Sequence, residues 1–173
     1  MINHPKIQGV SLEIIKASDF SKLLVWRNNP RIFKWCRQND LIDEAQHSKW
    51  FDSHADDKSI KMYAIHDEAQ TVGVCGLTSI DLVNQRAEFS LYIAPEHHGR
   101  GLGERGLKLL LWHGFNAYPL NIIWGESFDG NRAIDTFKRV GFKQEGVRRD
   151  FYFRDGKFID AHLFSIKRDE VKI

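Results

Sequence analysis

The chain has 173 residues and a mass of 20.1 kDa, which fits one compact domain spanning residues 1–173. A formal net charge of +2 and an apolar share of 42% exclude a strongly basic nucleic-acid-binding protein and a disordered chain. Cys36 and Cys75 belong to no Cys-x-x-Cys or Cys/His pattern, so we expect reduced thiols and no metal site. The start, MINHPKIQGV, has no signal-peptide pattern, and no apolar run approaches membrane-spanning length, so we expect a soluble cytoplasmic protein.

The first third of the chain reads as one strand followed by helices. Ser18 and Asp19 are suitable N-caps for a short amphipathic helix, and Asn28-Asn29-Pro30 ends it. Hydrophobic periodicity predicts a strand over residues 10–16, this first helix, a helical patch over residues 31–37 and a third helix over residues 43–54.

The rest of the chain alternates strands with helices. Pro95 ends a strand in which apolar residues alternate with polar or aromatic ones, and Gly141 caps a later helix. The predicted strands cover residues 62–65, 72–80, 86–93, 120–124, 142–148 and 158–166, and the predicted helices begin at residues 103 and 133.

The junction between the strand at residues 86–93 and the next helix has the pattern of an anion site. A glycine-rich turn leading into a helix N-terminus directs several N–H groups outward, and Gly99, Gly101 and Gly103 let a diphosphate approach the backbone. Arg100 adds a full positive charge. A purely structural turn is the alternative interpretation, while the spacing fits neither a P-loop nor a Rossmann fingerprint.

The order of motifs from residue 12 to residue 167 resembles the GNAT superfamily of acetyl-CoA-dependent N-acetyltransferases. The resemblance rests on the strand, the segment Pro95–Gly103, an amphipathic helix, a second strand, Asn131-Arg132-Ala133, another helix and Gly141-Phe142. His98–Gly103 matches the family signature Gln/Arg-x-x-Gly-x-Gly/Ala, with His98 in the Gln/Arg position. The resemblance implies an α/β fold (α+β by some schemes), with one mixed, mostly antiparallel twisted sheet of about six to seven strands flanked by helices.

The resemblance also implies acetyl-CoA as the cosubstrate, without a metal. Asn131 would bind the pantetheine side and Phe137 would pack beside it, although Asn131 also suits a helix N-cap. The implied contacts to the pantetheine arm are the backbone of Leu91, Tyr92 and Ile93, and those to the pyrophosphate are His98, Gly99, Arg100, Gly101, Leu102, Gly103 and Glu104.

Amine attack on a thioester needs a proton acceptor for the amine and a way to release the thiolate. Glu126, near the end of a strand, and Glu88, on the polar face of another, are the candidate bases, although both also suit salt-bridged surface positions. Many family members place a tyrosine where this chain has Phe137, which cannot donate a proton. Tyr152, Ser127, water and direct thiolate release stay open as alternatives.

By the same resemblance, the N-terminal helices and the last hairpin shape the acceptor cleft. The candidate acceptor residues are Trp26, Arg27, Asn28, Trp35, Arg148 and Arg149. Residues 26–30 and 42–50 resemble acetyltransferases of nucleotide-linked amino sugars, which is the acceptor we favour from the sequence. Residues 145–160 resemble ribosomal-protein and spermidine acetyltransferases, and a non-catalytic acyl-CoA-binding module is the alternative from another class.

The expected partner is a small-molecule or peptide amine, with no nucleic acid and no membrane. The predicted strand over residues 158–166 could form an exposed edge that pairs with a second copy in a homodimer.

Overall fold

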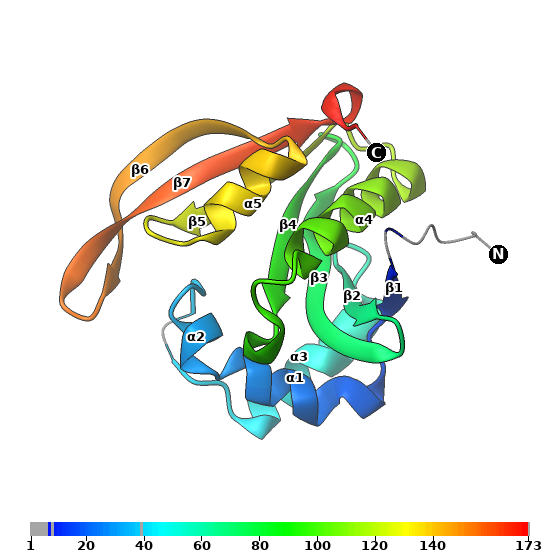
Figure 1. Cartoon of the computed structure of the whole chain (residues 1–173), viewed down its shortest axis with the longest axis vertical. Helices are drawn as coiled ribbons and strands as arrows, with labels where there is room; N and C mark the ends of the chain where they lie inside the picture. Colours follow the sequence, from blue (N-terminus) through cyan, green and yellow to red (C-terminus); the bar gives the residue numbers. More distant parts are fainter. Residues whose placement is uncertain (1–6, 8, 39, 173) are drawn as a thin grey trace.

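The computed structural model describes residue 7, residues 9–38 and residues 40–172, without the side chains of residues 54–56. Most of the segment MINHPKIQGV, from which we expect no signal peptide, lies outside these residues. Seven strands form one sheet in the order β1-β2-β3-β4-β5-β7-β6, and every neighbouring pair except β4 and β5 is antiparallel (Figure 1). The predicted mixed, mostly antiparallel sheet is therefore confirmed. In the described part of the chain, no helix is both long and apolar enough to cross a membrane.

The elements follow one another mostly where the hydrophobic pattern places them. The strands are β1 Val10–Ile14, β2 Lys61–Asp67, β3 Gln70–Asp81, β4 Arg86–Ile93, β5 Ile122–Phe128, β6 Lys143–Arg154 and β7 Lys157–Lys167. The helices are α1 Phe20–Arg27, α2 Pro30–Phe33, α3 Glu44–Asp56, α4 Leu102–Ala117 and α5 Ala133–Val140.

Four predictions of the fold need correction. Strand β6 runs to Arg154, beyond the predicted end at residue 148, because it pairs with β7 up to the turn that joins them. The helical patch over residues 31–37 shrinks to the single turn of α2, which starts at Pro30 and is capped by the side chain of Asn29. Strand β5 runs to Phe128, beyond the predicted end, because it pairs with β7 along its whole length. The prediction that residues 158–166 form an edge strand is wrong, since β7 lies between β5 and β6 and both of its sides are paired.

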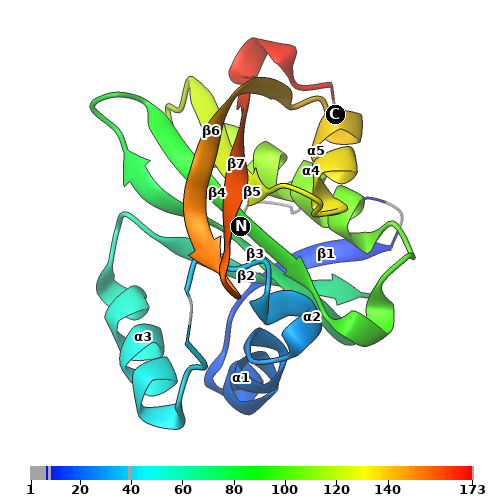
Figure 2. The same ribbon diagram turned by 90° about the vertical axis from the view of Figure 1, so that its left-hand side faces the viewer.

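Helices cover both faces of the sheet, and strand alternation assigns each residue to a face. Cys75 and Leu77 of β3 join the larger core under α4, together with Leu107 and Leu110 of that helix. Val74, on the opposite face, packs in a second cluster with residues of α1 and α2. Figure 2 shows α4 and α5 on one side of the sheet and α1, α2 and α3 gathered near its lower end.

The sheet opens between β4 and β5. These two strands pair only over Arg86–Glu88 and Ile122–Trp124, and beyond these residues they separate. The ring of Phe89 packs against β5 at this point, so close that a β-carbon on Gly125 would lie 2.5 Å from Phe89 Cε1. Phe89 also meets Phe137 of α5 edge-on, with ring centroids 4.9 Å apart. The separated strands are thus held apart on one face by a packed aromatic group.

Replacing Gly125 by Ala should destabilise the fold because its methyl group would meet a buried ring that is fixed by its neighbours. We expect the free energy of unfolding to fall by about 1–3 kcal/mol, measured by urea denaturation. Gly146→Ala is the matched control, because a β-carbon on this glycine of β6 meets nothing within 4 Å. Equal stability of the two variants would contradict the close approach of Phe89 to β5.

Candidate functional site

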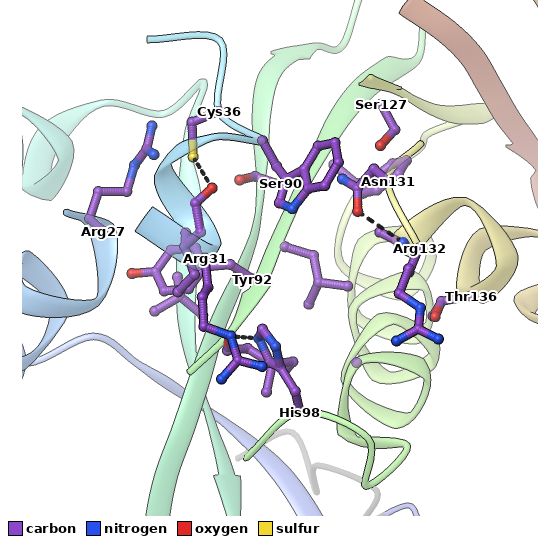
Figure 3. Close-up of a pocket in the computed structure, with 18 of the residues that line it drawn as sticks. Arg27, Arg31, Cys36, Ser90, Tyr92, His98, Ser127, Asn131, Arg132 and Thr136 are labelled. Atoms are coloured by element: carbon purple, nitrogen blue, oxygen red, sulfur yellow. Dashed lines mark hydrogen bonds between the residues drawn. The ribbon is translucent and has the colours of Figure 1, made fainter. Parts of the chain in front are cut away.

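A cleft of about 1320 Å³ follows the open side of β4. One wall is built by α1, α2 and the start of α3, and the other by β5, α5 and the residues before α5. Figure 3 shows Arg27, Arg31 and Cys36 on the first side and Asn131, Arg132 and Thr136 on the second. The cleft ends at the glycine-rich segment that connects β4 to α4.

This connecting segment has the geometry of an anion site. Gly99 and Gly101 have φ angles of +82° and +71°, and Gly101 is the N-cap of α4. A β-carbon on either glycine would meet nothing within 4 Å, so the backbone conformation, and not crowding, is what favours glycine here. The first N–H groups of a 16-residue helix therefore lie at the end of the cleft, where its dipole favours negative charge.

The predicted pyrophosphate residues line the cleft with one exception. His98, Gly99, Gly101, Leu102, Gly103 and Glu104 line it, as do Leu91, Tyr92 and Ile93 of β4. The guanidinium of Arg100 instead binds the Asp67 carboxylate at 2.7 Å, outside the lining. The His98 ring lies 2.7 Å, Nε2 to oxygen, from the carbonyl of Ile93.

Asn131 and Phe137 both lie on the α5 side of the cleft. Asn131 Oδ1 accepts a hydrogen bond from the backbone N–H of Ala133 at 3.0 Å, so its side chain supports the start of α5. Phe137 is 5% exposed and packs on Phe89, and its ring has no group that could donate a proton.

Both candidate bases bind the same arginine. Arg37, which follows α2, donates to Glu88 Oε1 and, at 2.7 Å, to Glu126 Oε1. Arg148 donates to Glu126 Oε2 at 3.1 Å, and the hydroxyl of Tyr152 donates to Glu126 Oε1. Glu126 and Glu88 line the cleft, whereas Tyr152 and Arg148 stand behind Glu126 and do not. Local sequence patterns did not point to Arg37, because its contacts come from strands far along the chain.

The electrostatics of this cluster keep Arg37 charged and Tyr152 protonated. Burial opposes the charge of Arg37, but the hydrogen bond and the charge of Glu88 raise its pKa above the ordinary value. Burial and the hydrogen bond to Glu126 raise the pKa of Tyr152 to about 12. The tyrosine is therefore a neutral hydrogen-bond donor at any ordinary pH.

The other predicted acceptor residues have mixed positions. Arg27 and Trp35 line the cleft, and Arg149 is exposed outside it. The Trp26 ring packs in the second core cluster, and its indole N–H donates to the carboxylate of the exposed Glu96 at 3.1 Å, which fits a structural role. The Asn28 amide exchanges two hydrogen bonds with the backbone of Ile42, at 2.7 and 2.9 Å.

The family follows from the comparison with known sequences. The model of the acetyltransferase (GNAT) domain matches residues 10–143. The chain belongs to the GNAT acetyltransferase family. It is 27% identical to the spermidine N(1)-acetyltransferase of Escherichia coli K12 over 160 residues, which cover 91% of this chain and 85% of that enzyme. The GNAT chain is therefore an acetyl-CoA-dependent N-acetyltransferase, as the sequence predicted.

Solved GNAT structures share the fold. The spermidine N-acetyltransferase of Vibrio cholerae in complex with CoA and spermine has a TM-score of 0.90 at 21% identity, with 95% of this chain and 98% of that one covered. Another structure of that enzyme is dodecameric. A ribosomal L7/L12 alpha-N-protein acetyltransferase has a TM-score of 0.82 at 18% identity, with 95% and 93% covered. Among the described residues, no cluster of His, Cys, Asp and Glu could hold a metal ion.

Replacing Gly101 by Ala should weaken CoA binding by about tenfold, because the strained backbone would move N–H groups that face the cleft end. Gly156→Ala is the matched control: its φ is +77° and its β-carbon also meets open space, but it lies in the β6–β7 turn. Isothermal titration calorimetry with CoA compares the two variants. Equal CoA affinities of the two variants would contradict a role for this segment in CoA binding.

Proposed function

We propose that acetyl-CoA binds with its pantetheine arm along the open edge of β4 and its pyrophosphate at residues 98–104. The observation that supports this is that the unpaired edge of β4 leads directly into the N-terminus of α4 along one continuous cleft. An extended amide chain can add to such an edge through backbone hydrogen bonds, as a further strand would. In this proposal residues 1–173 work as one N-acetyltransferase domain.

The amine nitrogen attacks the thioester carbonyl, the C–S bond breaks, and the nitrogen loses a proton. We propose the carboxylate pair of Glu88 and Glu126 as the proton acceptor, directly or through water. Both oxygens of Glu126 already accept hydrogen bonds, from Arg37, Tyr152 and Arg148. Within the described residues, Glu88 uses only Oε1, which leaves Oε2 for the incoming amine.

Tyr152 is better suited to hold Glu126 than to protonate the departing thiolate. A thiol has an ordinary pKa of about 8.5, well below the pKa of Tyr152, so proton transfer from this phenol to the thiolate would be uphill. The tyrosine also lies outside the cleft lining. We therefore assign it a positioning role, with the thiolate released directly or protonated by water.

The names of the related proteins indicate which kind of amine is the acceptor. The one at 27% identity is named for spermidine, and a structural neighbour is named for a ribosomal protein. These names support a polyamine or protein amine over the nucleotide-linked amino sugar that the sequence favoured, and they support an enzyme over a non-catalytic module. The acceptor amine enters, in this proposal, between α2 and β4, where the lining leads to Glu88.

We also propose that the chain self-associates through the β6–β7 hairpin. The hairpin projects from the sheet, and Phe151, Phe153 and Phe158 on it are 51%, 55% and 64% exposed (Figure 1). Such aromatic exposure is typical of a protein interface. The dodecameric Vibrio cholerae neighbour supports assembly, although β7 itself has no free edge for a homodimer.

Replacing Glu88 by Gln should lower kcat about a hundredfold with little change in CoA affinity, because the amide cannot accept the proton. Free thiol released from acetyl-CoA measures the rate with spermidine, an N-terminal peptide and an amino-sugar nucleotide as acceptors. Glu44→Gln, an exposed substitution at the start of α3, is the control. An unchanged kcat in Glu88→Gln would remove Glu88 from the mechanism.

A further inference from the structure

The N-terminal wall of the cleft carries only positive charge. Among the described residues between positions 23 and 50 that line the cleft, the charged ones are Arg27, Arg31, Lys34 and Arg37, and none is acidic. Acidic side chains line the cleft only in the second half of the chain, at Glu88, Glu104, Glu126 and Asp135. The three glutamates are already paired with arginine or lysine. Arg37 is paired with Glu88 and Glu126, but Arg27, Arg31 and Lys34 also line this wall, so a polycation would meet like charges along it.

Two buried polar atoms in this wall have no hydrogen-bond partner. They are Arg27 Nη1 and His47 Nδ1, and they are the buried side-chain nitrogen and oxygen atoms of the described part that remain unpaired. His47 is only 4% exposed, and both side chains line the cleft. An unpaired buried polar group costs about 1–3 kcal/mol, so two of them in one wall suggest a missing partner.

Contacts between α1 and α3 bring Arg27 and His47 together. Arg27 is the last residue of α1, and the next residue, Asn28, clamps the backbone of Ile42. Asp43 then caps α3, and His47 lies one turn into that helix, where its N–H donates to the Asp43 carbonyl at 3.0 Å. The clamp at Asn28 thus positions the start of α3 beside the end of α1.

The ring of His47 is also fixed in orientation. It stacks on Trp50, with centroids 5.6 Å apart and planes at 14°, and it packs against Phe20 at 4.5 Å. Burial and the nearby charge of Arg27 lower the pKa of His47, so the imidazole is neutral at pH 7. A neutral imidazole carries one N–H, and its unpaired Nδ1 can hold that proton.

We propose that Arg27 and His47 form a subsite for an anionic group, a carboxylate or a phosphate, that the amine acceptor carries. This inference rests on the proposed acetyl transfer in the same cleft. Arg27 Nη1 and His47 Nδ1–H supply two donors to the anion, and the surrounding Arg31 and Lys34 add attraction. The acceptor is thus an amine with a negatively charged end, in contrast to the polyamine in the names of the spermidine relatives.

Matched small amines test the subsite. The CoA-loaded protein is titrated calorimetrically with phosphoethanolamine, β-alanine, ethanolamine and spermidine, after CoA binding has been recorded by itself. We expect at least one of the two anionic amines to bind about tenfold more tightly than ethanolamine and spermidine. The order of phosphoethanolamine and β-alanine distinguishes a phosphate from a carboxylate. Equal affinities, tighter binding of spermidine, or no binding of either anionic amine overturns the proposal.

Three variants locate the effect. Arg27→Gln and His47→Phe should each weaken binding of the anionic amine by about tenfold. His47→Phe keeps the aromatic packing with Trp50, so it still tests the subsite if Arg27→Gln fails to fold. Lys49→Gln removes an exposed charge of α3 outside the cleft lining and should change nothing. Unchanged affinity in both cleft variants contradicts the subsite. Failure of CoA to bind would instead contradict the proposed acetyl transfer, and the same titrations without CoA would still test Arg27 and His47.

Discussion

The functional architecture depends on the separation of β4 from β5 after three residue pairs. A strand pair that continued to Ile93 would satisfy its own backbone groups and leave no room for a ligand. Because the strands part, one edge of β4 faces the cleft and leads to the N-terminus of α4. Phe89 against Gly125 makes the separation a packed feature of the core, so the opening does not depend on a bound molecule.

On the other face of the sheet, ion pairs connect β4 and β5 across the opening. Glu88 on β4 and Glu126 on β5 face the same side, and Arg37 binds both across the gap. The side chain of Glu126 is only 4% exposed, and Arg37 and Arg148 each pair with one of its two carboxylate oxygens. One arginine from the segment after α2 therefore connects the cleft wall formed by α1 and α2 to the two carboxylates. In the proposed function, this residue links binding of an acceptor beside α2 to proton transfer at Glu88.

Local patterns predicted the parts of this site that are local. The glycines at 99 and 101 adopt positive φ because the turn before α4 requires it, and a short stretch of sequence carries that signal. Arg37 and its glutamates are 51 and 89 residues apart, so no pattern within one element reveals their contact. For the same reason, the partner of Arg100, Asp67, and the position of β7 inside the sheet became visible only in the structure. The subsite at Arg27 and His47 depends on the Asn28 clamp, which is also a tertiary contact.

Hydrogen exchange with and without CoA tests the central claim most directly, because it reads the backbone of β4 itself. If the open edge of β4 receives the cosubstrate, saturating CoA should slow the exchange of amides in residues 89–93 and 98–104, while β1 and β2 on the far side of the sheet keep their rates. CoA binding that leaves residues 89–93 unprotected, or that protects the far strands instead, would contradict the account.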